Sequence, residues 1–186
     1  MSAAISLAAL NAMPAAGFTA RLGAIFEHSP WVAERAAARR PFASVAQLHA
    51  AMADAVRAAS PDERLRLIRA HPELAGKAAV RGELTDESTR EQKGAGLDQC
   101  SAEEFERMQD LNRRYNEKFG FPFVIAVKGH DRHSILRAFA QRLANAPAAE
   151  AAECIEQIIR IGGFRLAEAV GEQEAPSAQA AEAGER

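Results

Sequence analysis

The sequence predicts an all-α protein, a single compact domain of eight or nine helices. Alanine, the strongest helix former, occupies 43 of the 186 positions, whereas the aromatic residues that strands favour make up only 6%. Apolar residues recur at spacings of three and four along most of the chain, and serines, prolines and glycines mark the ends of these stretches. We expect the domain to span residues 1–170 and a flexible acidic tail to span 171–186.

Five helices are expected in the first seventy residues. Ser44 is a good N-cap, and so is Ser60, because it is followed by a first-turn proline and two acidic residues. The fifth helix has to end near His71, since Pro72 disfavours a helical conformation in the residue before it. The expected helices are 5–13, 17–27 (with Phe18, Leu22, Ile25 and Phe26 on one stripe), a third through Trp31 and Val32, a fourth after Ser44 and a fifth after Ser60.

The second half is less regular at first and then helical again. A polar segment, 85–93, lies between two pairs of glycines and is expected to be helical. Ser101 and Glu104 have the spacing of a capping box, and Gly120 is a plausible end for the helix that they begin. Residues 121–127 are expected to be an extended connector, because Pro122 and the isolation of the run argue against a sheet. Helices follow over 131–143 and after Pro147, the last interrupted at Gly162-Gly163.

Charge and composition exclude several classes of protein. The net charge is −2, and the segment 171–186 carries four glutamates against one arginine, so the rest of the chain lacks the basic surplus of a nucleic-acid-binding protein. No apolar run approaches the ~18 residues of a membrane helix, and the start lacks the basic region of a signal peptide. The two cysteines, Cys100 and Cys154, form no disulfide framework. We therefore expect a cytoplasmic protein that binds neither nucleic acid nor membranes.

Four polar residues, at three places in the sequence, are candidates for chemistry. His71 is held by Pro72 at a helix end and could carry a proton near neutral pH, although a capping or surface histidine is the commoner case. Ser88 and Glu91 would share a helix face, but their spacing is also that of a capping box. Arg165 could clamp a carboxylate or a planar amide, or be an ordinary surface arginine.

A metal site is not predicted. His130 and His133 have the spacing of a ligand pair, but no third ligand is evident. Cys100 and Cys154 both have the pattern of structural cysteines, without a nearby base in the sequence.

Several blocks, in order, resemble the OHCU decarboxylases, which act on 2-oxo-4-hydroxy-4-carboxy-5-ureidoimidazoline, the late intermediate between urate and allantoin. The resemblance covers about residues 5 to 170, and the ordered set of blocks is far more specific than any one of them. The blocks are 25–34 (IFEHSPWVAE), Pro41-Phe42, 71–77 (HPELAGK), 82–85 (GELT), 88–92 (STREQ), 96–98 (GLD), 119–125 (FGFPFVI) and 161–166 (IGGFRL).

The resemblance implies an all-α fold particular to this family, a homodimer, and decarboxylation to (S)-allantoin without a cofactor or metal. His71 would be the catalytic histidine, and Glu91 and Arg165 match the family's functional glutamate and arginine. The substrate pocket would be lined by Pro72, by Ser88, Thr89, Arg90, Glu91 and Gln92, and by Phe123, Val124, Ile125, Ala126 and Val127.

The chemistry of this substrate fits that motif set. Its carboxylate lies next to a carbon–nitrogen double bond that can accept the electrons, so the protein has to supply only orientation, charge and a proton. We expect His71 to manage the proton of the hydroxyl beside the carboxylate. Glu91 would hold that hydroxyl or the imidazole, and so favour protonated His71. Arg165 and the Gln92 amide would bind the ring and ureido carbonyls, and backbone groups of 123–127, unused by any sheet, would bind the hydantoin edge.

Two alternatives and one departure remain open. A non-catalytic interaction module could use the apolar stripe of the last helix (Ile155, Ile158, Ile159, Leu166), although core or a dimer interface explains the stripe more simply. A metal hydrolase using His130 and His133 would be inhibited by chelators. Gly162-Gly163 departs from the helix-favouring residues of many relatives, which leaves the pose of Arg165 open.

Overall fold

The computed structural model describes residues 4–171 and confirms the all-α prediction. Within these residues there are ten α-helices, one more than expected, because 77–81 forms a short helix of its own between Gly76 and Gly82. The elements are β1 (Ile5–Ser6), α1 (Leu7–Ala12), α2 (Ala15–Leu22), α3 (Trp31–Ala37), α4 (Val45–Arg57), α5 (Pro61–Arg69), α6 (Lys77–Arg81), α7 (Asp86–Gly94), the 3-10 helix η1 (Leu97–Gln99), α8 (Ala102–Phe119), α9 (Arg132–Arg142), α10 (Pro147–Ala169) and β2 (Val170–Gly171).

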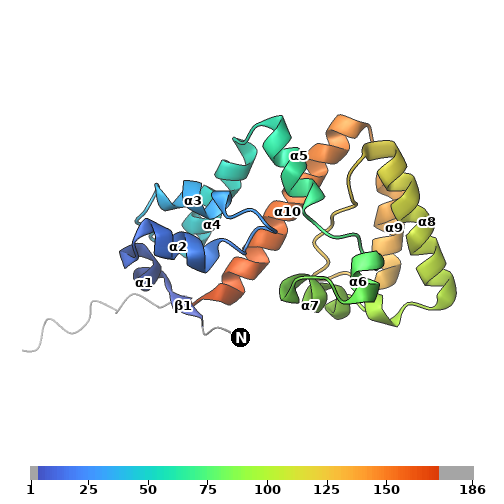
Figure 1. The fold of residues 1–186 in the computed structure, drawn as a ribbon, viewed down its shortest axis with the longest axis horizontal. Coiled ribbons are helices and arrows are strands. Elements are labelled where there is room, and N and C mark those ends of the chain that lie inside the picture. The colour runs from blue at the N-terminus through green and yellow to red at the C-terminus, as the bar shows by residue number, and fades with distance from the viewer. Residues whose placement is uncertain (1–3, 172–186) are drawn as a thin grey trace, which may run out of the picture.

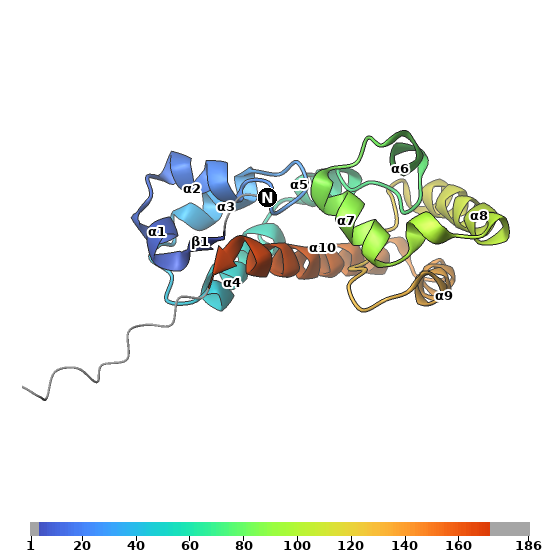
Figure 2. The ribbon, with the colours of Figure 1, turned by 90° about the horizontal axis from the view of Figure 1, so that it is seen from below.

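Helix α10 runs through the middle of the molecule and joins its two ends (Figures 1 and 2). Helices α1 to α4 gather round its C-terminal end, while α8 and α9 lie at its N-terminal end. Helices α4 and α5 pack directly against it. The apolar stripe of α10 is buried in this core, so it is not a free surface for a partner helix.

The predicted helix ends are confirmed where a side chain caps them. Ser44 accepts a hydrogen bond from the Gln47 N–H, and Ser60 and Ser101 each form a complete capping box with the glutamate three residues on. Gly120 ends α8 with a φ of 72°, a left-handed conformation that glycine adopts without strain. Residues 122–127 belong to no helix or strand, as expected for a connector.

Two predicted boundaries near the N-terminus are wrong. The first helix begins at Leu7, because Ile5 and Ser6 instead pair in parallel with Val170 and Gly171 at the end of α10. The second helix ends at Leu22, and residues 23–30 are irregular although the stripe positions Ile25 and Phe26 stay buried. Ile25 and Phe26 are thus buried from a loop, and their spacing in the sequence happens to match that of a helix face.

Helix α10 is continuous through Gly162-Gly163, where an interruption was expected. The two glycines serve close packing. A Cβ atom at position 162 would lie 2.6 Å from Cζ of Phe26, and one at position 163 would lie 3.0 Å from Cε1 of His49. His49 also bonds to the Ile159 carbonyl through Nε2, at 2.8 Å. Two aromatic rings thus reach the helix backbone where side chains are missing.

Among residues 4–171 there is no helix with the length and apolar character needed to cross a membrane. Of the expected acidic tail, only Gly171 belongs to the described residues, as part of β2.

Candidate functional site

The candidate site is built around His71, which follows the end of α5. Its Nδ1 lies 2.9 Å from the carbonyl oxygen of Leu67, one turn earlier. Because a carbonyl only accepts, Nδ1 carries the ring proton and Nε2 keeps its lone pair. Pro72 follows, and His71 as a whole residue is 7% exposed. The sequence thus leads to one defined tautomer.

The charge state of His71 differs from the expectation. Burial lowers the pKa of His71 to about 4, although the Leu67 hydrogen bond and the nearby Glu27 carboxylate both act to raise it. The imidazole is therefore neutral at pH 7. The expected carboxylate partner, Glu91, does not favour the protonated form because its oxygens are bound to Arg165, and the loss of hydration outweighs the charge of Glu27.

Arg165, on α10, is bound by two carboxylates. Its Nη1 donates to Oε2 of Glu27 at 2.8 Å, while Nε and Nη2 donate to the two oxygens of Glu91 at 2.7 and 2.8 Å. Burial lowers the pKa of Arg165, but the hydrogen bonds and charges of the two glutamates outweigh it, so the pKa lies above its usual value. The guanidinium is a permanent cation between elements far apart in the sequence.

Ten of the predicted site residues line one small hollow. His71 and Glu91 share it, and Arg165 closes one side. The lining includes His71, Pro72, Ser88, Glu91, Gln92, Phe123, Val124, Ile125, Val127 and Arg165. The segment that follows α5, helix α7, the 121–127 connector and α10 thus converge, although they are spread over almost a hundred residues of chain.

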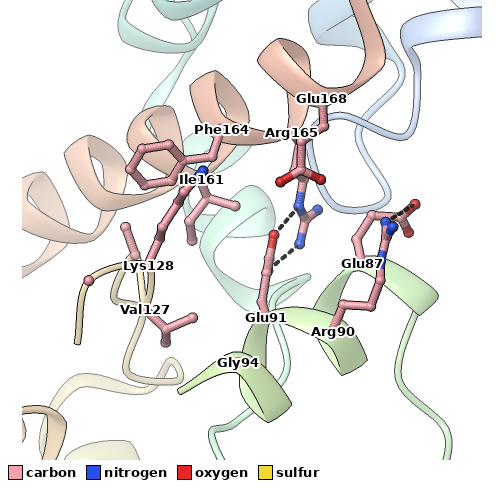
Figure 3. Close-up of a pocket in the computed structure, with 12 residues that line it drawn as sticks. Glu87, Arg90, Glu91, Gly94, Val127, Lys128, Ile161, Phe164, Arg165 and Glu168 are labelled. Carbon is pink, nitrogen blue, oxygen red and sulfur yellow. Dashed lines mark hydrogen bonds and ion pairs between the residues drawn. The ribbon is translucent and has the colours of Figure 1, made fainter. Parts of the chain in front are cut away.

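A larger cavity of about 320 Å³ adjoins this hollow and shares Glu91, Val127, Ile161 and Arg165 with it. Figure 3 shows the bonded pair of Glu91 and Arg165 facing Phe164, Ile161 and Val127, with Lys128 beside them. The predicted residues Arg90 and Ala126 line this larger cavity. Arg90 also forms an exposed ion pair with Glu87, at 3.5 Å.

Thr89 is the one predicted site residue that lies elsewhere. It faces a different pocket, together with Leu97 and Phe105. Helix geometry explains the separation, because Ser88, Glu91 and Gln92 are three and four residues apart and share a face of α7, whereas the position next to Ser88 is turned by about 100°. Grouping 88–92 as one segment therefore included a residue of another face.

Comparison with known proteins shows the family of this chain. The family model of the OHCU decarboxylases matches residues 11–167. The chain belongs to this family. It is 42% identical to the 2-oxo-4-hydroxy-4-carboxy-5-ureidoimidazoline decarboxylase of Haloferax volcanii, with 88% of this chain and 95% of that protein covered. It is also 42% identical to the uric acid degradation bifunctional protein PucL of Bacillus subtilis, with 88% of this chain covered, but spans only 32% of the length of that protein.

Two solved structures share the fold of this OHCU decarboxylase family member. An (S)-allantoin synthase matches with a TM-score of 0.71 and 31% identity, over 89% of this chain and 54% of that chain. An OHCU decarboxylase crystallised in the presence of (S)-allantoin matches with a TM-score of 0.63 and 20% identity, over 81% of this chain and 94% of that chain. The second likeness bears on the fold alone.

Sequence reasoning did not assign Glu27 to the site of this OHCU decarboxylase family member, although it lies inside a quoted block. Glu27 is buried, and its carboxylate accepts from Arg165, from Oγ1 of Thr85 at 2.9 Å and from Oγ of Ser88 at 3.4 Å. Burial alone would raise the pKa of Glu27, but Arg165 and Thr85 hold it below the usual value. A signal was present, because Glu27 directly follows the apolar pair Ile25-Phe26.

Several groups expected to bind a ligand already have partners. Gln92 accepts from the Ala75 N–H at 2.9 Å and donates to the Glu73 carbonyl at 3.4 Å, so its amide braces the chain after His71. In the connector, the Ala126 N–H donates to Gln157 and the Val124 carbonyl accepts from Arg142. Side chains thus use backbone groups that were expected to be free.

The N–H groups of Ile125 and Val127 differ from their neighbours in the connector. Both residues are buried, and neither N–H has a hydrogen-bond partner within residues 4–171. Buried N–H groups usually find a partner, so these two remain available to a ligand.

The histidine pair considered as metal ligands does not converge. Nδ1 of His130 lies 3.2 Å from Oγ of Ser134, and Nδ1 of His133 lies 3.2 Å from Oε1 of Glu104. In the part of the chain that the structure describes, no group of three or more His, Cys, Asp or Glu side chains is arranged to hold a metal ion. Cys154 is buried beside Tyr115 and Arg142, and burial raises the pKa of its thiol.

Proposed function

We propose that this chain is a cofactor-independent carboxy-lyase that converts 2-oxo-4-hydroxy-4-carboxy-5-ureidoimidazoline to (S)-allantoin in urate degradation. One observation carries the proposal: a neutral, buried imidazole shares a hollow with an arginine–carboxylate pair, beside a cavity of about 320 Å³. Family membership and the names of the Haloferax and Bacillus relatives support the same reaction.

The proposed reaction needs one proton acceptor, for the hydroxyl, and two protons to be delivered, to the ring nitrogen and to the neighbouring carbon, so one net proton is taken up from solvent. As the carboxylate leaves as carbon dioxide, its bonding electrons form a carbon–carbon double bond, and the adjacent imine nitrogen takes the displaced pair and a proton. The hydroxyl then loses its proton and becomes the ring carbonyl, while the neighbouring carbon receives a proton on one face. Product and carbon dioxide account for every heavy atom of the substrate.

His71 is proposed as the base that takes the hydroxyl proton. Its Nδ1 proton is held by Leu67, so Nε2 is the nitrogen that can accept. Because the pKa of His71 is lowered to about 4, the imidazole is unprotonated and ready at neutral pH. Pro72 restricts the backbone beside it, which helps to keep the ring in place.

Arg165 and Glu91 are proposed to bind the substrate's polar groups. The guanidinium can receive a carboxylate or carbonyl oxygen along the edge that Glu91 now occupies, through Nε and Nη2. Glu91, once released, can accept from an N–H group of the substrate, which leaves the hydroxyl proton to His71. The free N–H groups of Ile125 and Val127 are placed to hold a ring carbonyl at the other side of the hollow.

A coupled optical assay tests the proposal. Urate is converted by an oxidase and a hydroxyisourate hydrolase, and circular dichroism follows (S)-allantoin with and without this protein. We expect a large increase in the rate of optically active product. Racemic product formed at an unchanged rate would refute the assignment. His71→Ala should reduce the rate by at least about 100-fold while the far-ultraviolet helical spectrum persists.

We further propose that the protein is a cytoplasmic homodimer and needs no metal or cofactor. The two cysteines are unpaired, as is usual in a reducing compartment. Light scattering after gel filtration tests the dimer, and retention of full activity after dialysis against EDTA tests the independence from metal.

We also propose that residues 1–170 form the folded domain and 171–186 an acidic tail. The pairing of β1 with β2 supports a boundary near residue 171. Limited proteolysis should trim the chain to about this length without loss of activity.

A further inference from the structure

We propose that Glu27 is a positioning residue, which keeps the Arg165 guanidinium aimed at the cavity when a ligand takes the place of Glu91. This inference rests on the function proposed above, because the ligand is the substrate or its product allantoin. It assigns a role in the reaction to a residue outside the cavity wall.

The two glutamates bind different edges of the same guanidinium. Glu91 occupies Nε and Nη2 as a bidentate pair, and Glu27 holds Nη1 at 2.8 Å. A guanidinium is planar and rigid. A hydrogen bond that holds Nη1 therefore still fixes one end of the group while the partner of Nε and Nη2 changes from Glu91 to a ligand. The same arginine can thus be held and still bind a ligand.

The two glutamates also differ in access. The Glu91 side chain is 29% exposed and lines both the hollow and the larger cavity. The Glu27 side chain is 2% exposed and lines neither. A ligand that enters the cavity therefore meets Glu91 first and can displace it, whereas Glu27 stays behind the arginine.

Glu27 is itself held from three sides. Thr85 caps α7 and donates to Oε1 of Glu27 at 2.9 Å, and the Ser88 hydroxyl lies 3.4 Å from both carboxylate oxygens. The preceding residue, Phe26, packs its ring against Gly162, which lies three residues before Arg165 and hence on the same face of α10. The missing side chain at position 162 lets residues 26 and 27 approach the helix beside Arg165.

These contacts explain how Arg165 keeps its direction during exchange. Without Glu27, the guanidinium would be held only by Glu91 and by a long bond of 3.4 Å from Nη2 to the Ser88 hydroxyl, so the ligand that releases Glu91 would leave the arginine weakly held. With Glu27 in place, the ligand meets a cation that is already oriented, so less conformational entropy is lost on binding. The cost of binding is thereby reduced.

Nuclear magnetic resonance of the Arg165 Nε–H group tests the anchor directly, with the signal assigned by its loss in Arg165→Lys. Glu91→Ala removes both acceptor oxygens and so mimics the released state. We expect the order parameter to stay near 0.85 in this variant and to fall below about 0.6 in the double variant Glu27→Ala/Glu91→Ala. Disorder in Glu91→Ala alone, or order in the double variant, would overturn the proposal.

Binding and kinetics test the consequence. Allantoin is uncharged, so a change in its affinity does not reflect the overall charge of the site. For Glu27→Gln we expect the Kd for allantoin and the KM to rise at least about tenfold, with kcat within about threefold. Glu156 lies on α10, like Arg165, and forms an exposed pair with Arg57 of α4; Glu156→Gln breaks this pair, is the matched control and should change neither the Kd nor the KM.

A purely structural role for Glu27 predicts a different result. Thermal stability would fall, while the KM and the allantoin Kd of the folded protein would match the wild type. This pattern would refute the positioning role. If the wild-type protein shows no turnover, the proposed function fails, but the resonance experiment still decides whether Glu27 anchors Arg165.

Discussion

Nδ1 of His71 donates its proton to the carbonyl oxygen of Leu67, four residues earlier and 2.9 Å away. This bond selects one tautomer and directs the basic nitrogen, Nε2, away from the helix end. Burial then keeps the ring neutral, because the pKa of His71 is lowered to about 4. A histidine at the end of a helix thus becomes a base that is available over a wide range of pH.

The first prediction concerns pH. Because the pKa of His71 is about 4 when folded and about 6.5 when unfolded, the unfolded chain binds more protons between these values. The contribution of neutral His71 to the free energy of unfolding is therefore fully present above pH 6.5. It is lost as the pH falls towards 4, by up to about 1.4 kcal/mol per pH unit. Urea denaturation at several pH values measures this slope. His71→Gln should reduce it.

The pH dependence of kcat/KM should also reflect the lowered pKa of His71. We expect kcat/KM to stay level from pH 8 down to about 5, without an acid limb near the usual histidine value. A limb near pH 6.5 would show that His71 titrates normally in the free enzyme, and would contradict the neutral, buried base.

The second prediction separates two neighbouring hydroxyls of α7. Ser88 lines the hollow and bonds to Glu27, whereas Thr89 faces another pocket. Ser88→Ala should lower kcat/KM by about tenfold, since a buried hydrogen bond to a charged group is worth roughly 1.5 kcal/mol. Thr89→Val should change kcat/KM by less than about twofold, within the spread of surface substitutions. Equal losses would mean that both hydroxyls reach the substrate.

The third prediction concerns Lys128, whose Nζ lies 4.8 Å from the Phe164 ring centroid in the wall of the larger cavity. Glu27, Glu91, Arg165 and neutral His71 together carry a net negative charge, which an anionic substrate has to approach. Lys128→Met should raise the KM about fivefold at low ionic strength and less in 0.5 M salt, because salt screens this attraction. Lys77→Met, which removes an equal charge from an exposed position outside that cavity, is the control. A salt-independent change would argue for packing instead.

The fourth prediction compares the two glycines of α10. Gly162→Ala places a methyl group 2.6 Å from the Phe26 ring, so overpacking of about 1–3 kcal/mol exceeds the gain in helix propensity of about 1 kcal/mol. Gly163→Ala has the same propensity gain, but its nearest neighbour is the His49 ring at 3.0 Å. We expect only Gly162→Ala to weaken allantoin binding, as measured by calorimetry. If both substitutions changed allantoin affinity equally, the contact between Phe26 and Gly162 would have no specific role in ligand binding.

Much of the fold could be predicted because its causes are local. Ser44, Ser60 and Ser101 cap the helices that they were expected to begin, and Gly120 ends α8 as predicted. Caps and turn residues act over three or four positions, so they are visible in a short stretch of sequence. The pairing of Ile5 with Val170 was missed because it joins the two ends of the described chain, and short apolar stretches there resemble helix.

In the candidate site, too, some features have local causes and others depend on contacts between residues far apart in the sequence. The sequence by itself determined the residue types: a histidine held by a proline, a polar face on α7, an extended connector and an arginine on α10. Their ordered blocks were enough to indicate the family. The tertiary structure alone decided how they combine, because charge states and hydrogen-bond partners depend on distances across the chain. Burial made His71 neutral, Arg165 bonded to both oxygens of Glu91, and the contact between Phe26 and Gly162 brought Glu27 to the arginine from 138 residues away.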